Sequence, residues 1–280
     1  MRLLVTGAAG MLGRRVVGEA QRRGHEVVPA DLAEFDLTDP ATTDAFVVDA
    51  APQVVVNCAA YTQVDRAEED EPLALAVNGA GAGNVARAAA AAGARVVHVS
   101  TDYVFDGSAD RPWVESDPTG PLGAYGRTKL AGEHEVLAAG DGNAIVRTAW
   151  LFGAGGPNFP DTMLRLARER GRLTVVTDQI GSPTWTGHLA AALVDCAETP
   201  DRTGIFHAAG AGAGVSWHAF AQEIVRRAGL DVPVEGVTSD AFPRPAPRPA
   251  WSVLGTERPS PLVLPSWQDG LQAHLDEETT

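Results

Sequence analysis

The sequence of 280 residues predicts an α/β protein with a doubly wound parallel sheet followed by a smaller C-terminal lobe. In residues 1–150, short β-branched apolar runs alternate with longer alanine-rich stretches that have a helical pattern. Strands that helices bury on both faces have this nearly continuous apolar character. After Trp150 the regular alternation ends, which predicts a second and less regular unit.

The first half contains the expected strands and helices of the sheet. The strands are the apolar runs at 2–7, 25–31, 53–60, 94–102 and 143–150. The helices are the stretches at 11–24, 39–51, 72–93 and 125–140. Several of these stretches end at Gly, which is a common stop signal for a helix. Helical crossovers of this length predict parallel pairing of the strands, with helices on both faces of the sheet.

The second half has a different order of elements. We expect helices at 158–171, 187–198 and 216–229 and a strand at 204–210. The proline-rich segment 242–254 has a PxxP-like pattern, which is typical of a docking ligand for another protein or of an extended surface loop. In a small lobe we favour the loop.

Composition excludes several classes of function. The net charge of -14 repels phosphate backbones and no Lys/Arg run offsets it, so we expect no nucleic-acid partner. The two cysteines, Cys58 and Cys196, lie in apolar or alanine-rich runs and are expected to be buried small side chains. No apolar run reaches membrane-spanning length, and the N-terminal run is too short for a signal peptide. We therefore expect a cytoplasmic protein without a membrane partner.

A glycine motif points to a nucleotide. Gly7, Gly10 and Gly13 follow the first expected strand and open the first expected helix. Glycines there let the backbone approach a pyrophosphate, which then meets the free N–H groups of the helix. Asp31 follows the second expected strand, where a carboxylate either accepts hydrogen bonds from the adenosine ribose or caps a turn. We favour the ribose contact, which predicts a Rossmann-type dinucleotide-binding domain.

This assignment divides the chain. The dinucleotide-binding domain is expected at 1–150 with a returning segment at about 184–210, and the substrate-binding lobe at 151–183 and 211–280.

A second group of side chains points to proton transfer. Thr101 and Asp102 end the fourth expected strand, at the sheet edge where open α/β folds bind their ligands. Tyr125 and Lys129 are four residues apart at the start of the next helix, so they share one helix face. The pair alone is either an exposed aromatic–cation contact or a proton donor with its activator. We favour the catalytic interpretation because hydroxyl, phenol and ammonium converge on one edge.

The motifs resemble those of the extended short-chain dehydrogenase/reductases and, within them, the dTDP-4-dehydrorhamnose reductase family. The glycine and Tyr-x-x-x-Lys motifs identify only the superfamily. The segments STDYVFDG at 100–107, RTAW at 147–150 and DQIGSPT at 178–184 are much more specific. Matching segments cover the chain almost from end to end, in family order.

The resemblance implies reduction of a dTDP-linked 4-keto-6-deoxy sugar, with NADPH or NADH as the source of hydride. Tyr125 would donate the proton to the sugar C4 carbonyl oxygen, and Thr101 would hydrogen-bond that oxygen. The ammonium of Lys129 would lower the pKa of the phenol and would hold the nicotinamide ribose.

The resemblance also implies the remaining contacts. The expected cofactor-binding residues are Gly7, Gly10, Met11, Leu12, Gly13, Asp31, Asp36, Leu37, Ala59, Ala60, Tyr61, Tyr125 and Lys129. The expected substrate-binding residues are Thr101, Asp102, Tyr125, Trp150 and Asn158, with Gln179 and Arg248 as weaker candidates. For Trp150 the alternative is a core position, and for Asp102 it is a turn cap.

Alternatives to this function remain open. Another deoxysugar nucleotide could be the substrate of the same chemistry. A dehydratase is disfavoured because Thr101 precedes Asp102-Tyr103 and not an Asp-Glu pair. A non-catalytic regulatory subunit is disfavoured because Thr101, Tyr125 and Lys129 are retained.

Two further expectations concern metals and assembly. Some family members form dimers through a divalent metal held by carboxylates, one of them early in the first helix. The corresponding neighbourhood here is Arg14-Arg15, so we expect no bridging metal and a monomer or weak homodimer. The histidine spacing predicts no catalytic metal.

Overall fold

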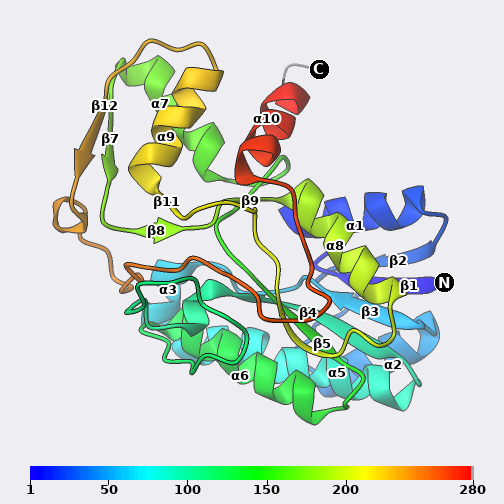
Figure 1. Cartoon of the computed structure of the whole chain (residues 1–280). Coiled ribbons are helices and arrows are strands. Elements are labelled where there is room, and N and C mark those ends of the chain that lie inside the picture. The colour runs from blue at the N-terminus through cyan, green and yellow to red at the C-terminus, as the bar shows by residue number, and fades with distance from the viewer. Residues whose placement is uncertain (279–280) are drawn as a thin grey trace.

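A six-stranded parallel sheet organises the molecule, which we describe from a computed structural model over residues 1–278 (Figure 1). The strand order is β10-β5-β4-β3-β1-β2. The bounds of these strands are β1 Arg2–Thr6, β2 Glu26–Ala30, β3 Val54–Asn57, β4 Arg95–Thr101, β5 Ala144–Thr148 and β10 Gly204–His207. Each pair of neighbours is parallel, as the apolar runs predict.

Helices cover both faces of this sheet. One face packs against α1 (Met11–Arg22) and α8 (Thr186–Glu198), and their side chains share a core with Leu3 and Val5. The other face packs against α2 (Pro40–Ala50), α5 (Ala82–Ala91) and α6 (Ala124–Ala138). The sheet is therefore doubly wound, as predicted.

The segment between β3 and β4 is less regular than the single helix expected at 72–93. It contains α3 (Val64–Glu69), α4 (Glu71–Leu75) and a π-helical stretch, η1 (Ala76–Gly81), before α5 begins. The side chain of Asp70 accepts a hydrogen bond from the backbone N–H of Leu73 and so caps α4. The π-helical stretch packs against α6, and the alanine- and glycine-rich sequence gives no signal for it.

The C-terminal lobe lies above one end of the sheet in Figure 1. Its bounds are β6 Leu151–Phe152, α7 Phe159–Arg170, β7 Leu173–Val176, β8 Ile180–Gly181, β9 Thr184–Trp185, β11 Val215–Ser216, α9 Trp217–Arg227, β12 Val234–Val237 and α10 Trp267–Glu278. The strands form small pairs, β12 with β7, β11 with β8 and β6 with β9. Phe152, Phe220 and Trp267 belong to the core of this lobe.

The proline-rich segment 242–254 contains no helix or strand; only a 3-10 turn, η3 (Ser239–Ala241), precedes it. Trp251 forms an isolated bridge with Ile180, and Leu254 forms one with Trp113. The segment is thus an extended loop laid across the junction of the two units. Strand β12 and helix α10 were not predicted from the sequence. No helix within residues 1–278 is long and apolar enough to cross a membrane.

A buried ion pair fixes α6 on the sheet. Arg147 on β5 donates two hydrogen bonds to Glu133 on α6, with Nη2–Oε2 at 2.6 Å and Nε–Oε1 at 2.9 Å. The hydroxyl of Ser100 on β4 also donates to Glu133 Oε1. Both charged side chains are at most 2% exposed. Helix α6 is therefore tied to two strands at one point, one turn after Lys129.

Removal of one partner of this pair is expected to destabilise the protein strongly. Glu133→Gln leaves the buried guanidinium of Arg147 without a counter-charge, a change that typically costs about 3–5 kcal/mol. The double variant Glu133→Gln/Arg147→Met should recover much of that loss because no uncompensated charge remains. Chemical denaturation measures the free energy of unfolding of all three proteins.

The matched control is Arg165→Met, which removes an exposed ion pair with Glu169 on α7. This variant should cost less than about 1 kcal/mol. A Glu133→Gln protein as stable as the control would show that the buried pair does not anchor α6.

Candidate functional site

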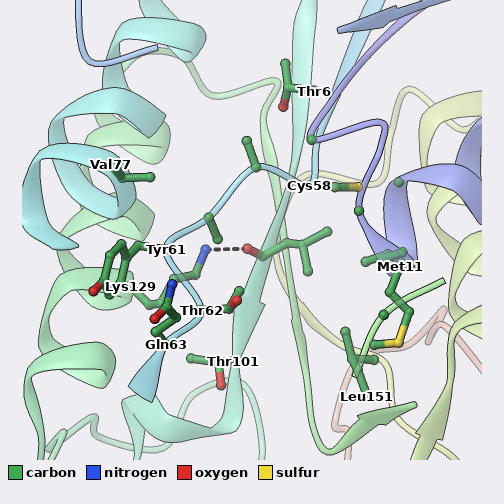
Figure 2. A pocket seen from close by; sticks show the side chains of 18 of the residues that line it. Thr6, Met11, Cys58, Tyr61, Thr62, Gln63, Val77, Thr101, Lys129 and Leu151 are labelled. Atoms are coloured by element: carbon green, nitrogen blue, oxygen red, sulfur yellow. Dashed lines mark hydrogen bonds between the residues drawn. The ribbon is translucent and has the colours of Figure 1, made fainter. Parts of the chain in front are cut away.

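A cavity of about 940 Å³ opens at the carboxyl edge of the parallel sheet. Its lining includes residues that follow strands β1, β2, β3, β4 and β5, and also residues of α6 and of the C-terminal lobe. The sequence-predicted residues that it brings together are Gly7, Gly10, Met11, Leu12, Gly13, Asp31, Asp36, Leu37, Ala59, Ala60, Tyr61, Thr101, Asp102, Tyr125, Lys129 and Trp150. In Figure 2, Lys129 and Tyr61 lie on one side of the cavity, and Met11 and Leu151 lie on the other.

The turn between β1 and α1 has the shape that a pyrophosphate requires. Gly7 has φ +64°, and a Cβ built there would lie 2.7 Å from the backbone nitrogen of Ala59. A Cβ on Gly13 would lie 2.0 Å from the carbonyl oxygen of Gly7. Only glycine permits this approach, and Gly10 leads directly into the N-terminus of α1. The chain's own backbone therefore fits a dinucleotide here, with free N–H groups and the positive helix end facing the cavity.

Asp31 lies beside the glycine turn at one end of the cavity. It follows β2, and its Oδ2 accepts a hydrogen bond from the backbone N–H of Ala9 at 2.8 Å. This contact holds the carboxylate against the glycine turn while the side chain still lines the cavity. Asp36 differs, because its Oδ1 accepts from both the backbone N–H and the hydroxyl of Thr38. These bonds lower the pKa of the Asp36 carboxyl.

Thr101 and Asp102 form a buried pair at the end of β4. The hydroxyl of Thr101 donates to Asp102 Oδ1 at 3.0 Å and accepts from the backbone N–H of Tyr103 at 3.2 Å. Burial raises the pKa of Asp102 to about 6. The carboxylate of Asp102 in turn disfavours a second negative charge nearby. Burial, with this charge added, raises the pKa of Tyr125 to about 12, while the hydroxyl of Thr101 opposes the rise.

Lys129 does not act on Tyr125 as the sequence analysis expected. Its Nζ donates to the carbonyl oxygen of Val99 at 2.8 Å, drawn as the dashed line in Figure 2, and lies 3.3 Å from His98 Nε2. The phenol pKa is raised by burial and by the Asp102 carboxylate. The expectation of a lowered Tyr125 pKa is therefore wrong for the protein without cofactor. The physical reason is that Nζ of Lys129 is turned toward β4, while burial and the Asp102 carboxylate disfavour the phenolate of Tyr125.

Two tryptophans line the part of the cavity that the C-terminal lobe closes. Trp150 has φ +46° and stacks on Trp217 with ring centroids 3.4 Å apart and planes 2° from parallel. Trp217 begins α9 and was missed by the sequence analysis, because it stands in a helical pattern that resembles an ordinary core helix. Tyr103, also missed, lies edge-on to Tyr125 at 5.6 Å.

Three predicted substrate contacts lie elsewhere. Asn158 is a buried cap of α7: its Oδ1 accepts from the backbone N–H of Asp161 and its Nδ2 donates to Gly153 and Gly156 carbonyls. Its polar atoms are thus already used, and it does not line the cavity. Gln179 donates to Ser239, and Arg248 pairs with Asp65, so neither of these side chains reaches the cavity.

The neighbourhood of Arg14-Arg15 is occupied by protein contacts. Arg14 donates to the carbonyl oxygen of Ala9, and Arg15 pairs with Glu277 on α10. Within residues 1–278, no group of three or more His, Cys, Asp or Glu side chains is placed to hold a metal ion. The expectation of a monomer or weak homodimer stays a prediction.

Comparison with known proteins agrees with this geometry. The family model described as the RmlD substrate binding domain matches residues 1–280. A dTDP-4-dehydrorhamnose reductase from Streptomyces griseus is 48% identical over 267 residues, covering 92% of this chain and 86% of that protein. A probable dTDP-4,6-dihydroxy-2-methyloxan-3-one 4-ketoreductase from Streptomyces antibioticus is 44% identical over 265 residues, covering 92% and 88%.

A solved structure also has nearly the same fold as this chain. The dTDP-4-dehydrorhamnose reductase from Bacillus anthracis in complex with NADP has a TM-score of 0.95 and 36% identity, covering 99% of both chains. The Rossmann-type fold class is therefore confirmed. With its whole length matched by the family model and by relatives of high identity, the chain belongs to the family of the RmlD substrate binding domain.

Proposed function

We propose that this protein is an NAD(P)H-dependent oxidoreductase that reduces the 4-keto group of dTDP-4-dehydro-L-rhamnose to give dTDP-L-rhamnose. The observation that carries the proposal is the single cavity that joins the glycine turn at Gly7 to the hydroxyl groups of Thr101 and Tyr125. A dinucleotide that follows α1 and the edge of the sheet has its nicotinamide end beside these groups. The proposal agrees with the names of the Streptomyces griseus and Bacillus anthracis relatives.

The chain's own groups hold the proton and orient the ketone. The reduced nicotinamide supplies a hydride when the cofactor is bound. Tyr125, with its pKa raised to about 12, keeps its proton at neutral pH and is therefore a loaded donor. Thr101 offers its hydroxyl to the carbonyl oxygen as negative charge develops there. In the cofactor-free protein that hydroxyl donates to Asp102 Oδ1 at 3.0 Å, so it has to turn away from Asp102 to donate to the ketone.

The C-terminal lobe would bind the nucleotide sugar. Trp150 and Trp217 supply an aromatic wall, and Trp217 comes from the lobe. The two units keep the roles expected from the sequence. Residues 1–150 with about 184–210 would hold the dinucleotide, and residues 151–183 with 211–280 would hold the sugar nucleotide. Both NADPH and NADH are candidate cofactors; the Bacillus anthracis relative binds NADP, whereas Asp31 favours a free ribose hydroxyl.

A different deoxysugar substrate is the second candidate. The Streptomyces antibioticus relative, 44% identical, is named as a probable 4-ketoreductase of another dTDP-sugar. The proton donor and the glycine turn would serve that reaction equally well, so the aromatic wall would decide between the two substrates.

A coupled assay tests the function. The purified protein receives dTDP-glucose with a dehydratase and an epimerase, and nicotinamide absorbance is followed with NADH and NADPH in separate reactions. Oxidation that requires both upstream enzymes supports the rhamnose pathway substrate. Oxidation with the dehydratase alone supports another 4-keto sugar. No oxidation by a protein that binds the cofactor would overturn the proposal.

Replacement of Tyr125 by Phe should remove the proton donor and keep the ring. Because general acid catalysis contributes about 10²–10⁴-fold, kcat should fall by at least roughly 100-fold. Dinucleotide affinity, measured by isothermal titration calorimetry, should change little, because the phenyl ring keeps its edge contact with Tyr103 and so keeps its place in the cavity. Unchanged turnover would exclude Tyr125 as the donor.

Replacement of Asp31 by Ala should shift cofactor preference toward NADPH. The change removes a hydrogen-bond acceptor for the ribose and a charge that repels a 2′-phosphate. The ratio of kcat/KM for NADPH over NADH should rise by roughly tenfold, the equivalent of about 1.4 kcal/mol. Asp31→Asn, which keeps the acceptor oxygen that Ala9 uses, is the control and should give an intermediate ratio. A constant ratio in both variants would show that Asp31 does not contact the ribose.

A further inference from the structure

A row of buried polar side chains crosses the sheet beneath the cavity. Thr6 on β1, Asn57 on β3 and His98 on β4 are register partners on neighbouring strands. Each of them is at most 1% exposed. Lys129, 2% exposed, comes from α6 and ends the row at His98. Buried polar groups on apolar strands must be hydrogen-bonded, so the donor and acceptor of every contact can be worked out.

Backbone geometry sets the orientation of Asn57. The backbone N–H of Ala59, which can only donate, lies 3.2 Å from Asn57 Oδ1. The hydroxyl of Thr6 donates to the same oxygen at 2.6 Å. The amide nitrogen Nδ2 of Asn57 is therefore the atom that faces His98 Nδ1, at 3.0 Å. An amide nitrogen only donates, so Nδ1 of His98 must be the acceptor and carries no proton.

This assignment favours the uncharged form of Lys129. A neutral imidazole with a bare Nδ1 carries its proton on Nε2, which lies 3.3 Å from Lys129 Nζ. An ammonium at Nζ would place two donors face to face. A free amine instead accepts from His98 Nε2–H through its lone pair and still donates to the carbonyl oxygen of Val99. The hydrogen bonds then run in one direction from Thr6 to Val99.

We propose that His98 is a positioning residue that favours the uncharged amine of Lys129 over the ammonium in the cofactor-free protein. Lys129 is therefore expected to lose its proton at a lower pH than an ordinary lysine. The importance of this for catalysis rests on the proposed function.

The other groups around Lys129 agree with this assignment. Cys58, which follows β3, is an uncharged thiol because burial raises its pKa to about 12. Glu133, on the same helix, is neutralised by Arg147 on β5. Burial lowers the pKa of Lys129 to about 8, although Glu133 opposes the change, and it lowers the pKa of His98, so that ring is neutral.

The composition of the chain makes the proposal directly measurable. Lys129 is the single lysine among 280 residues. The 21 arginines keep their charge in proteins and do not titrate in this range. Protein grown with ¹³C-labelled lysine therefore gives one lysine Cε signal, which needs no assignment. Its chemical shift against pH reports the charge of Lys129 in cofactor-free protein, without turnover.

The wild-type protein is expected to titrate with a midpoint near 8, well below the ordinary lysine value of 10.5. In ¹⁵N-histidine-labelled protein, the ring signal that disappears in His98→Gln should show the proton on Nε2. A midpoint at the ordinary value, or a proton on Nδ1, would overturn the proposal. The lysine titration uses only the wild-type chain, so it does not depend on a variant that folds; His98→Gln serves only to identify the ring signal.

The variant His98→Gln tests whether His98 or burial alone lowers the titration midpoint of Lys129. Its amide can turn an oxygen toward Nζ, which favours the ammonium, so the midpoint should rise by about one pH unit or more. His207→Gln is the matched control, since His207 is a buried histidine on β10 that contacts Trp113 and Gly255 and not Lys129. It should leave the midpoint unchanged. An unmoved midpoint in His98→Gln would show that burial alone sets the charge. A protein without reductase activity could still pass these tests, so failure of the function and failure of the inference are distinguishable.

Discussion

The site depends on the position of one helix on the sheet. Helix α6 carries both Tyr125 and Lys129, and the buried pair of Glu133 with Arg147 fixes it to β5, with Ser100 adding a contact to β4. A buried ion pair is weak evidence for net stability, but it tolerates only one arrangement of its partners. That arrangement places the phenol at the same edge as the end of β4. Proton transfer needs such placement, because a donor acts only within hydrogen-bond reach.

Much of the fold follows from patterns that short segments contain. The five apolar runs of the first half are all strands, and the alternation with helices predicts their parallel order. The glycine turn is equally local, because the close approach of Gly13 to Gly7 leaves no room for a side chain. These features were predictable since each is decided by a few neighbouring residues. Strand β12 and helix α10 were missed because their patterns are weak and their partners lie far away in the chain.

The sequence predicted which residues meet at one cavity, but not the contacts that each of them makes there. Residue types and their order placed Thr101, Tyr125 and Lys129 correctly at one cavity. The pKa of Tyr125 was misjudged, because it depends on burial and on Asp102, which sequence spacing does not reveal. Asn158 was misassigned for a similar reason: a cap and a ligand contact use the same amide, and only the partners distinguish them. Trp217 shows the reverse case, where a residue of an ordinary helix reaches the cavity through the packing of the lobe.

The central claim is that one cavity holds a reduced dinucleotide and a keto sugar so that hydride moves directly between them. Deuterium transfer tests this claim most directly. The protein would receive a 4-keto sugar nucleotide and a reduced dinucleotide that carries deuterium at the transferable nicotinamide position, and the product would be examined by NMR. The account predicts deuterium at C4 of the sugar, with none exchanged from solvent. Product that lacks the label, or label at another carbon, would contradict it.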